Sequence, residues 1–156
     1  MDKLLEYPFN NSLLLKKHKF IRRELSKSNN LVEKRIAILG GSTTNLIKDF
    51  LELFLLNKGI KPIFYESDYN KYFEDAIFGN ITLDSFNPDY IYIHTTYRNI
   101  NFLPPITSGT FENTIELIEN FFQNFIKIWD TLSKKFECSI IQNNFEYPPR
   151  APARFW

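Results

Sequence analysis

One serine, Ser42, stands where a buried strand should give way to a helix. It follows the apolar residues 36–39 and then Gly40 and Gly41, and a helical spacing of apolar residues begins soon after it. Open α/β sheets bind ligands at the carboxyl ends of their parallel strands. A hydroxyl at the start of a helix lies among free N–H groups, which favour an anion or a carbonyl oxygen. Ser42 is therefore predicted to be a nucleophile or a ligand-binding residue.

Gly41 and Thr43 are predicted to bind the same ligand through the turn around Ser42. The alternative is that a hydroxyl of Ser42, Thr43 or Thr44 only caps the helix. The pattern does not match Gly-x-Ser-x-Gly, so it does not support the nucleophile elbow of an α/β hydrolase. It matches neither the phosphate-binding P-loop nor the Gly-x-Gly-x-x-Gly fingerprint of a dinucleotide site.

A second group of polar residues follows the third expected strand. Asn99 could donate its amide to an oxyanion, and Arg98 could bind a carboxylate or a phosphate. The alternative is a loop held by Asn and Thr turn bonds. His94 lies near the end of the apolar strand and is interpreted as a core residue rather than as a catalytic base.

A third group, Asn143 and Asn144, follows the fourth expected strand. Strands one, three and four should be neighbours, so the loops after them should converge, and these asparagines are expected at the rim of the crevice that holds Ser42 and Asn99. Turn formation is the alternative. Glu66, Ser67 and Asp68, after strand two, would complete the rim.

The elements that must position these residues alternate along the chain. Strands are expected at residues 35–39, 61–65, 90–94 and 138–142, with helices at 43–57 and 113–135. A capping box of Asn113 and Glu116 is expected at the start of the long helix. This order predicts a three-layer α/β/α sandwich with a parallel, flavodoxin-like sheet of order 2-1-3-4. The sheet is expected to be truncated after its fourth strand.

Three regions are expected: an N-terminal helical leader at 1–34, an α/β domain at 35–146 and a Pro-rich tail at 147–156. The leader helix, near 12–25 with its cap at Asn11 or Ser12, should pack Leu14, Ile21 and Leu25 on the domain or on a partner. Nine Lys and Arg against four Asp and Glu make residues 1–35 basic. A solvated helix face explains this charge, and no nucleic-acid partner is predicted.

Composition excludes several classes of protein. The single cysteine, Cys138, excludes an internal disulfide framework and a cysteine zinc cluster, and we expect it to be a buried hydrophobe. The histidines and carboxylates have no metal-ligand spacing, so neither a metal nor a cofactor is predicted. The chain contains no apolar run long enough for a membrane span and no signal core, and a cytoplasmic location is expected.

Several blocks of the sequence resemble the N-terminal region of FkbH-like proteins, which belong to the haloacid dehalogenase (HAD) superfamily, subfamily IIIC. The resemblance covers roughly residues 4–148. It is most specific at the Gly-Gly-Ser-Thr-Thr block of residues 40–44 and the Gln-Asn-Asn-Phe block of residues 142–145. Weaker matches lie at residues 53–60, 64–66 and 86–89.

The resemblance implies an SGNH-hydrolase-like domain, normally followed by a HAD phosphatase domain. Ser42 would take the nucleophile's place and Asn99 the place of the SGNH asparagine. The chain departs from the pattern in three ways: Gly41 replaces an aspartate, the late Asp-x-x-His block is missing, and no HAD Asp-x-Asp-x-Thr motif is present. A serine without its base loses most of its nucleophilic power, so low esterase activity is expected.

The function implied by the resemblance is help with glyceryl or acyl transfer to or from a carrier protein, in secondary-metabolite or surface-polysaccharide biosynthesis. The partners would be a downstream HAD-type domain and an acyl-carrier protein. Two alternatives stay open. The domain could be a non-catalytic binding module for such a partner, or it could be a simple serine ester hydrolase.

Overall fold

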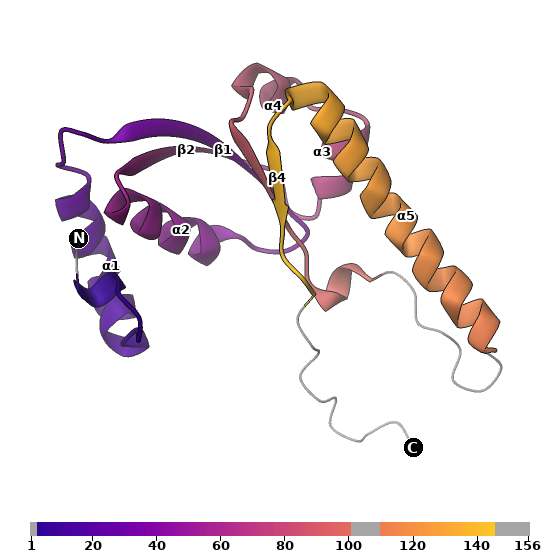
Figure 1. The fold of residues 1–156 in the computed structure, drawn as a ribbon, viewed down its shortest axis with the longest axis horizontal. Helices are drawn as coiled ribbons and strands as arrows, with labels where there is room; N and C mark the ends of the chain where they lie inside the picture. The colour runs from indigo at the N-terminus through magenta and orange to yellow at the C-terminus, as the bar shows by residue number, and fades with distance from the viewer. Residues whose placement is uncertain (1–2, 101–109, 146–156) are drawn as a thin grey trace.

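The protein is built on one sheet of four parallel strands. The computed structural model describes residues 3–100 and 110–145. The strand order is β2-β1-β3-β4, and all three pairings are parallel (Figure 1). The predicted fold class and strand order are therefore confirmed. The strands are β1 (Val32–Gly40), β2 (Ile60–Glu66), β3 (Tyr90–His94) and β4 (Ser139–Gln142).

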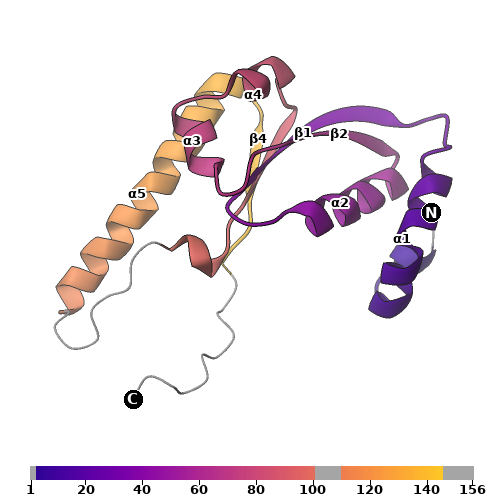
Figure 2. The ribbon, with the colours of Figure 1, turned by 180° about the vertical axis from the view of Figure 1, so that it is seen from behind.

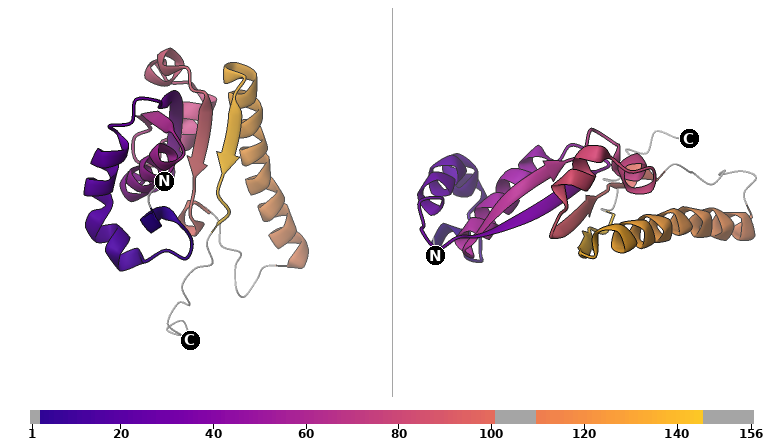
Figure 3. Two further views of the ribbon diagram at one scale, coloured as in Figure 1. Left: turned by 60° about the vertical axis from the view of Figure 1, so that its left-hand side comes forward. Right: turned by 90° about the horizontal axis from the view of Figure 1, so that it is seen from above.

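Helices cover both faces of the sheet. Helices α3 and α5 pack on one face, α2 lies on the other, and α1 packs outside α2 (Figures 1 and 3). Helices α1 and α5 thus lie at opposite ends of the molecule (Figure 2). The helical elements are η1 (Lys3–Leu5), α1 (Asn11–Leu25), α2 (Asn45–Asn57), α3 (Tyr72–Ile77), α4 (Ile81–Phe86), η2 (Tyr97–Asn99) and α5 (Phe111–Phe136).

The central strand β1 explains the uninterrupted apolar run in the sequence. It pairs with β2 on one side and β3 on the other, and its residues from Ile36 to Gly40 are all buried. A parallel strand that is covered on both faces has no solvent side, so it does not alternate apolar with polar residues. β1 begins at Val32, within the range expected for the leader.

The main core lies between the sheet and α5. Alternate residues of β3, Ile91 and Ile93, are fully buried against this helix, together with Phe125, Ile128 and Leu132 of α5. The three-and-four spacing of apolar residues along this helix is only partly confirmed as a buried face, because Ile115, Ile118 and Phe122 near its start are 44%, 50% and 50% exposed.

The start of α5 differs from the prediction. The helix begins at Phe111, and the Thr110 hydroxyl accepts a hydrogen bond from the Asn113 backbone N–H at 3.2 Å. The expected capping box at Asn113 and Glu116 is wrong, because Asn113 is already inside the first turn. Its N–H is one of the groups that a cap satisfies, so Asn113 cannot itself be the cap.

The leader helix α1 packs on α2. Leu14 and Ile21 are 6% and 2% exposed and share a small core with Leu53, and Leu25 lies against it. The Arg22 guanidinium lies 3.2 Å from a Glu52 carboxylate oxygen of α2. The predicted apolar face therefore contacts the domain. The cap is Asn10 rather than Asn11 or Ser12, since the Asn10 side chain accepts from the Leu13 backbone.

Helix α4 had no counterpart in the sequence prediction. The Asn80 side chain caps α4 by accepting from the Thr82 and Leu83 backbone N–H groups. Leu83 is fully buried in the main core. Six residues are too few for a helical spacing of apolar residues to be recognised in the sequence. The Asn80 cap and the burial of Leu83 stabilise this helix instead.

Helix α2 covers only part of the sheet face on which it lies, and an apolar groove runs beside it. Ile36 of β1 and Leu51 of α2 line one side of an apolar groove, while Tyr90 of β3 and Ile141 of β4 on its other side are 38% and 54% exposed. Helix α2 covers the β1 side of this face and leaves the β4 side accessible. Within the described ranges, no helix is long and apolar enough to cross a membrane.

Candidate functional site

The turn after β1 is fixed by the ends of both neighbouring strands. The Gly41 N–H donates to the His94 carbonyl at the end of β3, at 2.7 Å. The Gly40 N–H donates to the Ser67 hydroxyl, which follows β2, at 2.9 Å. The Ser67 N–H in turn donates to the Ile38 carbonyl at 3.0 Å. Ser67 is 9% exposed and serves to hold this turn at the carboxyl edge of the sheet.

Asn99 lies directly against the same turn. Its side chain is 6% exposed, and its Nδ2 donates to the Gly41 carbonyl at 2.8 Å and to Asn70 Oδ1 at 3.0 Å. Its Oδ1 accepts from the Thr96 N–H at 2.8 Å, which closes the capping box of η2. An amide has two N–H donors, and both are engaged here. Donation to a bound oxyanion would require one of these two bonds to open.

The contact with Asn99 explains why a glycine occupies position 41. A Cβ on Gly41 would lie 2.6 Å from both Nδ2 and Oδ1 of Asn99. That separation is well inside the van der Waals distance, so no side chain fits while Asn99 keeps its position. Gly41 stands at the position where the SGNH nucleophile block has an aspartate. Gly41 and Asn99 therefore form a matched pair.

Ser42 is half-buried and stands before α2 rather than in its first turn. Helix α2 begins at Asn45, so the expectation that the helix starts at residue 43, directly after Ser42, is wrong. Thr44 occupies the cap position, is 4% exposed and makes no side-chain capping bond, whereas Thr43 is exposed. The helix position alone does not surround Ser42 with first-turn N–H groups. The residue directly before Ser42 is Gly41, whose carbonyl accepts a hydrogen bond from Asn99.

The asparagines after β4 have different environments. Asn143 Oδ1 accepts from the Thr95 N–H at 2.9 Å, and its Nδ2 donates to the Thr95 carbonyl at 2.7 Å. Thr95 is fully buried, so this pair of bonds fastens the end of β4 to the end of β3. The side chain of Asn144 is exposed. The structure thus places Asn143 in the framework of the edge and Asn144 on its surface.

The charged and basic candidates lie further out. Arg98 is exposed, its Nε donates to the Tyr97 hydroxyl at 3.3 Å, and its guanidinium lies 5.7 Å from the centre of the Tyr97 ring. His94 is half-buried with its Nδ1 3.3 Å from the Tyr92 hydroxyl. The second histidine, His18, lies on α1, where its Nδ1 is 2.7 Å from the Leu15 carbonyl oxygen. The described residues contain no group of three or more potential metal ligands.

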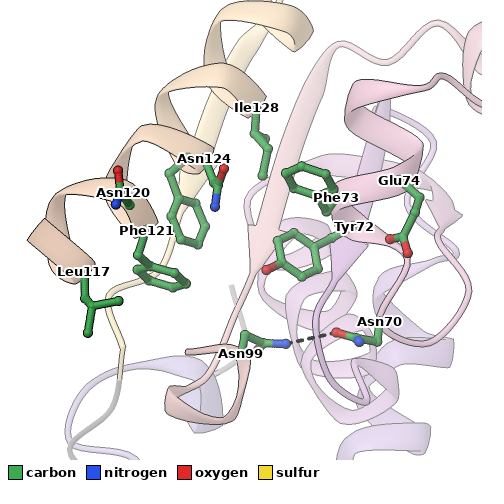
Figure 4. Close-up of a pocket in the computed structure, with 11 residues that line it drawn as sticks. Asn70, Tyr72, Phe73, Glu74, Asn99, Leu117, Asn120, Phe121, Asn124 and Ile128 are labelled. Atoms are coloured by element: carbon green, nitrogen blue, oxygen red, sulfur yellow. Dashed lines mark hydrogen bonds between the residues drawn. The ribbon is translucent and has the colours of Figure 1, made fainter. Parts of the chain in front are cut away.

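A pocket of about 410 Å³ opens beside Asn99, between α3 and α5 (Figure 4). Its lining comes from several separate segments, and Ser42 is not part of it. The polar lining is formed mainly by Asn70, Tyr72, Asn99, Asn120 and Asn124. The sequence analysis missed all of these except Asn99. Asn70 could have been predicted, because it lies in the loop after β2 and loops after parallel strands meet at the same edge of the sheet.

Cys138 lies just before β4 and is half-buried against the main core. Burial raises the pKa of its thiol, which keeps the group neutral. The residue packs against the core as expected, but it is half-buried rather than buried.

Comparison with known proteins identifies a structural relative. No protein family and no curated protein matches the sequence. Among solved structures, the chain is similar to the N-terminal part of the protein BF1531 from Bacteroides fragilis, which contains a phosphatase domain complexed with Mg. The TM-score is 0.63 at 16% sequence identity, and the match covers 89% of this chain. This likeness establishes a shared fold.

The present chain spans only about a third of that solved protein, since the match covers 35% of its length. The similar region therefore corresponds to one part of a protein that also contains a phosphatase domain. This arrangement is compatible with the HAD-type partner domain that the sequence resemblance implies.

Proposed function

We propose that this chain is the SGNH-like domain of an FkbH-like protein and that it holds an acyl or glyceryl group during transfer to or from a carrier. A HAD-type phosphatase domain would act beside it. Three findings support this: the Gly-Gly-Ser-Thr-Thr and Gln-Asn-Asn-Phe blocks, the confirmed strand order, and the likeness to part of a protein with a phosphatase domain.

One observation carries the proposal. The buried Asn99 amide holds the Gly41 carbonyl at 2.8 Å, so the residue before Ser42 is fixed at the edge where ligands of open α/β sheets bind. Ser42 would contact the carbonyl or carboxyl oxygen of the bound group. Arg98, Thr43 and Asn144 are the exposed residues of the same edge and would complete the contact surface.

The proposal assigns binding rather than rapid hydrolysis to this site. A serine hydroxyl is a weak nucleophile unless a positioned base removes its proton. The two histidines have other neighbours, since His18 lies on α1 and His94 contacts Tyr92. The Asn99 amide is also fully engaged, which leaves the usual oxyanion donor without a free N–H.

The test compares Ser42→Ala with Ser28→Ala, which alters an exposed serine before β1, away from the carboxyl edge of the sheet. Binding of butyryl-pantetheine and of glyceryl-pantetheine would be measured by calorimetry, and hydrolysis of p-nitrophenyl butyrate would be followed in parallel. We expect Ser42→Ala to weaken binding of the acylated probes about tenfold, equivalent to about 1.4 kcal/mol. We expect no hydrolysis that depends on Ser42.

Two outcomes would reject this assignment. Strong esterase activity that Ser42→Ala abolishes, together with covalent labelling of Ser42 by a fluorophosphonate, would identify a simple serine hydrolase instead. Equal binding of the acylated probes by the wild-type protein and the Ser42→Ala variant would remove Ser42 from the binding site.

A further inference from the structure

The pocket between α3 and α5 has two kinds of wall. Aromatic rings of Phe73 and Phe121 form apolar sides, and side-chain amides of Asn70, Asn120 and Asn124 project from the loop after β2 and from α5 (Figure 4). Each of these amides can both donate and accept hydrogen bonds. A pocket with apolar sides and a few convergent polar groups is the usual form of a small-molecule site.

The Tyr72 hydroxyl is the most informative group in this pocket. Tyr72 is 9% exposed, and its ring stacks on Phe125 at a centroid distance of 6.5 Å. Its hydroxyl points into the pocket (Figure 4). Because this hydroxyl faces the pocket, it can donate a hydrogen bond to an acceptor atom of a ligand bound there.

The charge of the lining selects the ligand. Among the residues that the structure describes, the pocket lining includes no Lys, Arg or His, and the carboxylate of the lining residue Glu74 lies 3.6 Å from Lys71 Nζ. An anion would enter without a cationic partner, which is unfavourable at a partly buried site. Burial and the charge of Glu74 raise the pKa of Tyr72, so its hydroxyl stays a donor at neutral pH.

The size of the pocket limits the ligand further. A volume of about 410 Å³ lies toward the lower end of the range of roughly 300–1,000 Å³ that is usual for small-molecule pockets. The pocket therefore accommodates a slender chain or a single ring rather than a large cofactor.

We propose that this pocket binds an uncharged ligand that carries amide or hydroxyl groups on a slender carbon skeleton, with Tyr72 and Asn124 as its principal hydrogen-bonding residues. The proposal rests on the proposed function, because it supplies a place for the non-reacting part of the transferred molecule. Asn99 joins the two sites, since it lines the pocket and also holds the Gly41 carbonyl next to Ser42. Two sources offer this chemistry: the pantetheine arm of a carrier protein and a neutral sugar unit.

The experiment titrates the whole chain with D-pantetheine and separately with N-acetyl-D-glucosamine, following backbone amide NMR shifts around Tyr72 and Asn124. Neither probe contains an acyl or glyceryl ester, so the result is independent of Ser42. We expect at least one probe to bind, and we expect Tyr72→Phe and Asn124→Ala each to weaken it about five- to tenfold. Binding of pantetheine alone would identify the carrier arm, and binding of the sugar alone would identify a free saccharide.

Matched controls separate the pocket from general effects. Tyr69→Phe alters a tyrosine that is 74% exposed, and Gln123→Ala alters the neighbour of Asn124 outside the pocket, so both should bind like the wild-type protein. Asn124 is itself exposed, so Asn124→Ala tests the pocket even if Tyr72→Phe disturbs the core. Three results would overturn the proposal: no shift with either probe at millimolar concentration, no effect of either pocket variant, or tighter binding of 4'-phosphopantetheine than of pantetheine.

Discussion

At the scale of single residues, the carboxyl edge of the sheet is organised by three polar side chains, of which two are buried and Asn143 is half-buried. Ser67, Asn99 and Asn143 each bond to the backbone of a neighbouring loop. Such bonds hold irregular backbone in one conformation where no regular ladder is available. The edge is therefore a rigid platform, and the exposed residues around it are the ones free to meet a ligand.

The pair of Gly41 and Asn99 gives the first prediction. Gly41→Ala forces a Cβ to within 2.6 Å of the Asn99 amide, and it should destabilise the fold by about 1–3 kcal/mol. Asn99→Ala should also destabilise it, by about 1–3 kcal/mol, because the Gly41 carbonyl and the Thr96 N–H lose their partner. Urea denaturation measures both free energies of unfolding.

The double variant decides whether the clash is the cause. Truncating Asn99 removes the atoms that the new Cβ would meet, so the Gly41→Ala, Asn99→Ala protein should lose at least about 0.5 kcal/mol less than the sum of the single losses. Strict additivity would show that Gly41 is required for a reason other than Asn99.

Adjacent asparagines give the second prediction. Asn143→Ala removes two bonds to the buried Thr95 backbone and should cost about 1–3 kcal/mol of stability. Asn144→Ala changes an exposed side chain and should stay within about 0.5 kcal/mol of the wild type. Thermal unfolding of the two variants side by side is the measurement, and equal stabilities would contradict the framework role of Asn143.

Alkaline pH gives the third prediction. Burial first, and then the hydrogen bond to Asp75, raise the pKa of Tyr65 above its ordinary value of 10.0. The folded state then keeps a proton that the unfolded state releases, so the free energy of unfolding should be constant below about pH 10 and fall as the pH rises above it. Denaturant titrations between pH 8 and pH 11.5 measure this fall.

Tyr65→Phe should make the alkaline fall shallower, because its side chain has no proton to lose. The variant should be less stable than the wild type at neutral pH, since Asp75 loses a hydrogen bond of 3.0 Å. Tyr69→Phe, at a side chain that is 74% exposed, should keep the wild-type profile. An unchanged slope in Tyr65→Phe would assign the alkaline effect to other groups.

At the scale of elements, the leader helix gives the fourth prediction. Leu14 and Leu15 are neighbours of the same type, but they are 6% and 53% exposed. Leu14→Ala should cost about 2–4 kcal/mol of global stability if α1 unfolds together with the domain, whereas Leu15→Ala should change it by less than about 0.5 kcal/mol. Denaturation followed by tryptophan fluorescence in a Trp156→Phe background reports on α5, where Trp129 lies. A loss seen only in helix content would mean that α1 frays independently.

The elements that the sequence predicted well are the ones whose pattern is long. The run of apolar residues in β1 and the helical spacing of apolar residues along the 26 residues of α5 are local in sequence. Both could therefore be recognised without a structure. The cap at Thr110 and the short helix α4 depend on single hydrogen bonds and on the burial of Leu83. The burial of Leu83 emerges only when distant residues meet, whereas the Thr110 cap is a local contact that the sequence analysis misplaced at Asn113.

The candidate site shows the same division. The positions of Ser42 and Asn99 near the sheet edge followed from topology, because loops after neighbouring parallel strands converge. The partners of the Asn99 amide did not follow, since Asn70 has a left-handed backbone with φ of 59° and brings its side chain across from the β2 loop. Tyr72 likewise enters the pocket only because α3 packs against α5.

At the scale of the whole molecule, the crossover between β3 and β4 has a consequence for the folding kinetics. β1 and β2 are joined through α2 alone, whereas β4 pairs with β3 only after the chain has run through η2 and the whole of α5. Closing a longer loop costs more entropy, and non-local parallel pairing is slow. We therefore expect β1, α2 and β2 to form the folding nucleus, with β4 docking after the rate-limiting barrier. Stopped-flow chevron analysis should then show that Leu51→Ala, at the contact of α2 with β1, slows folding, while Leu132→Ala mainly accelerates unfolding.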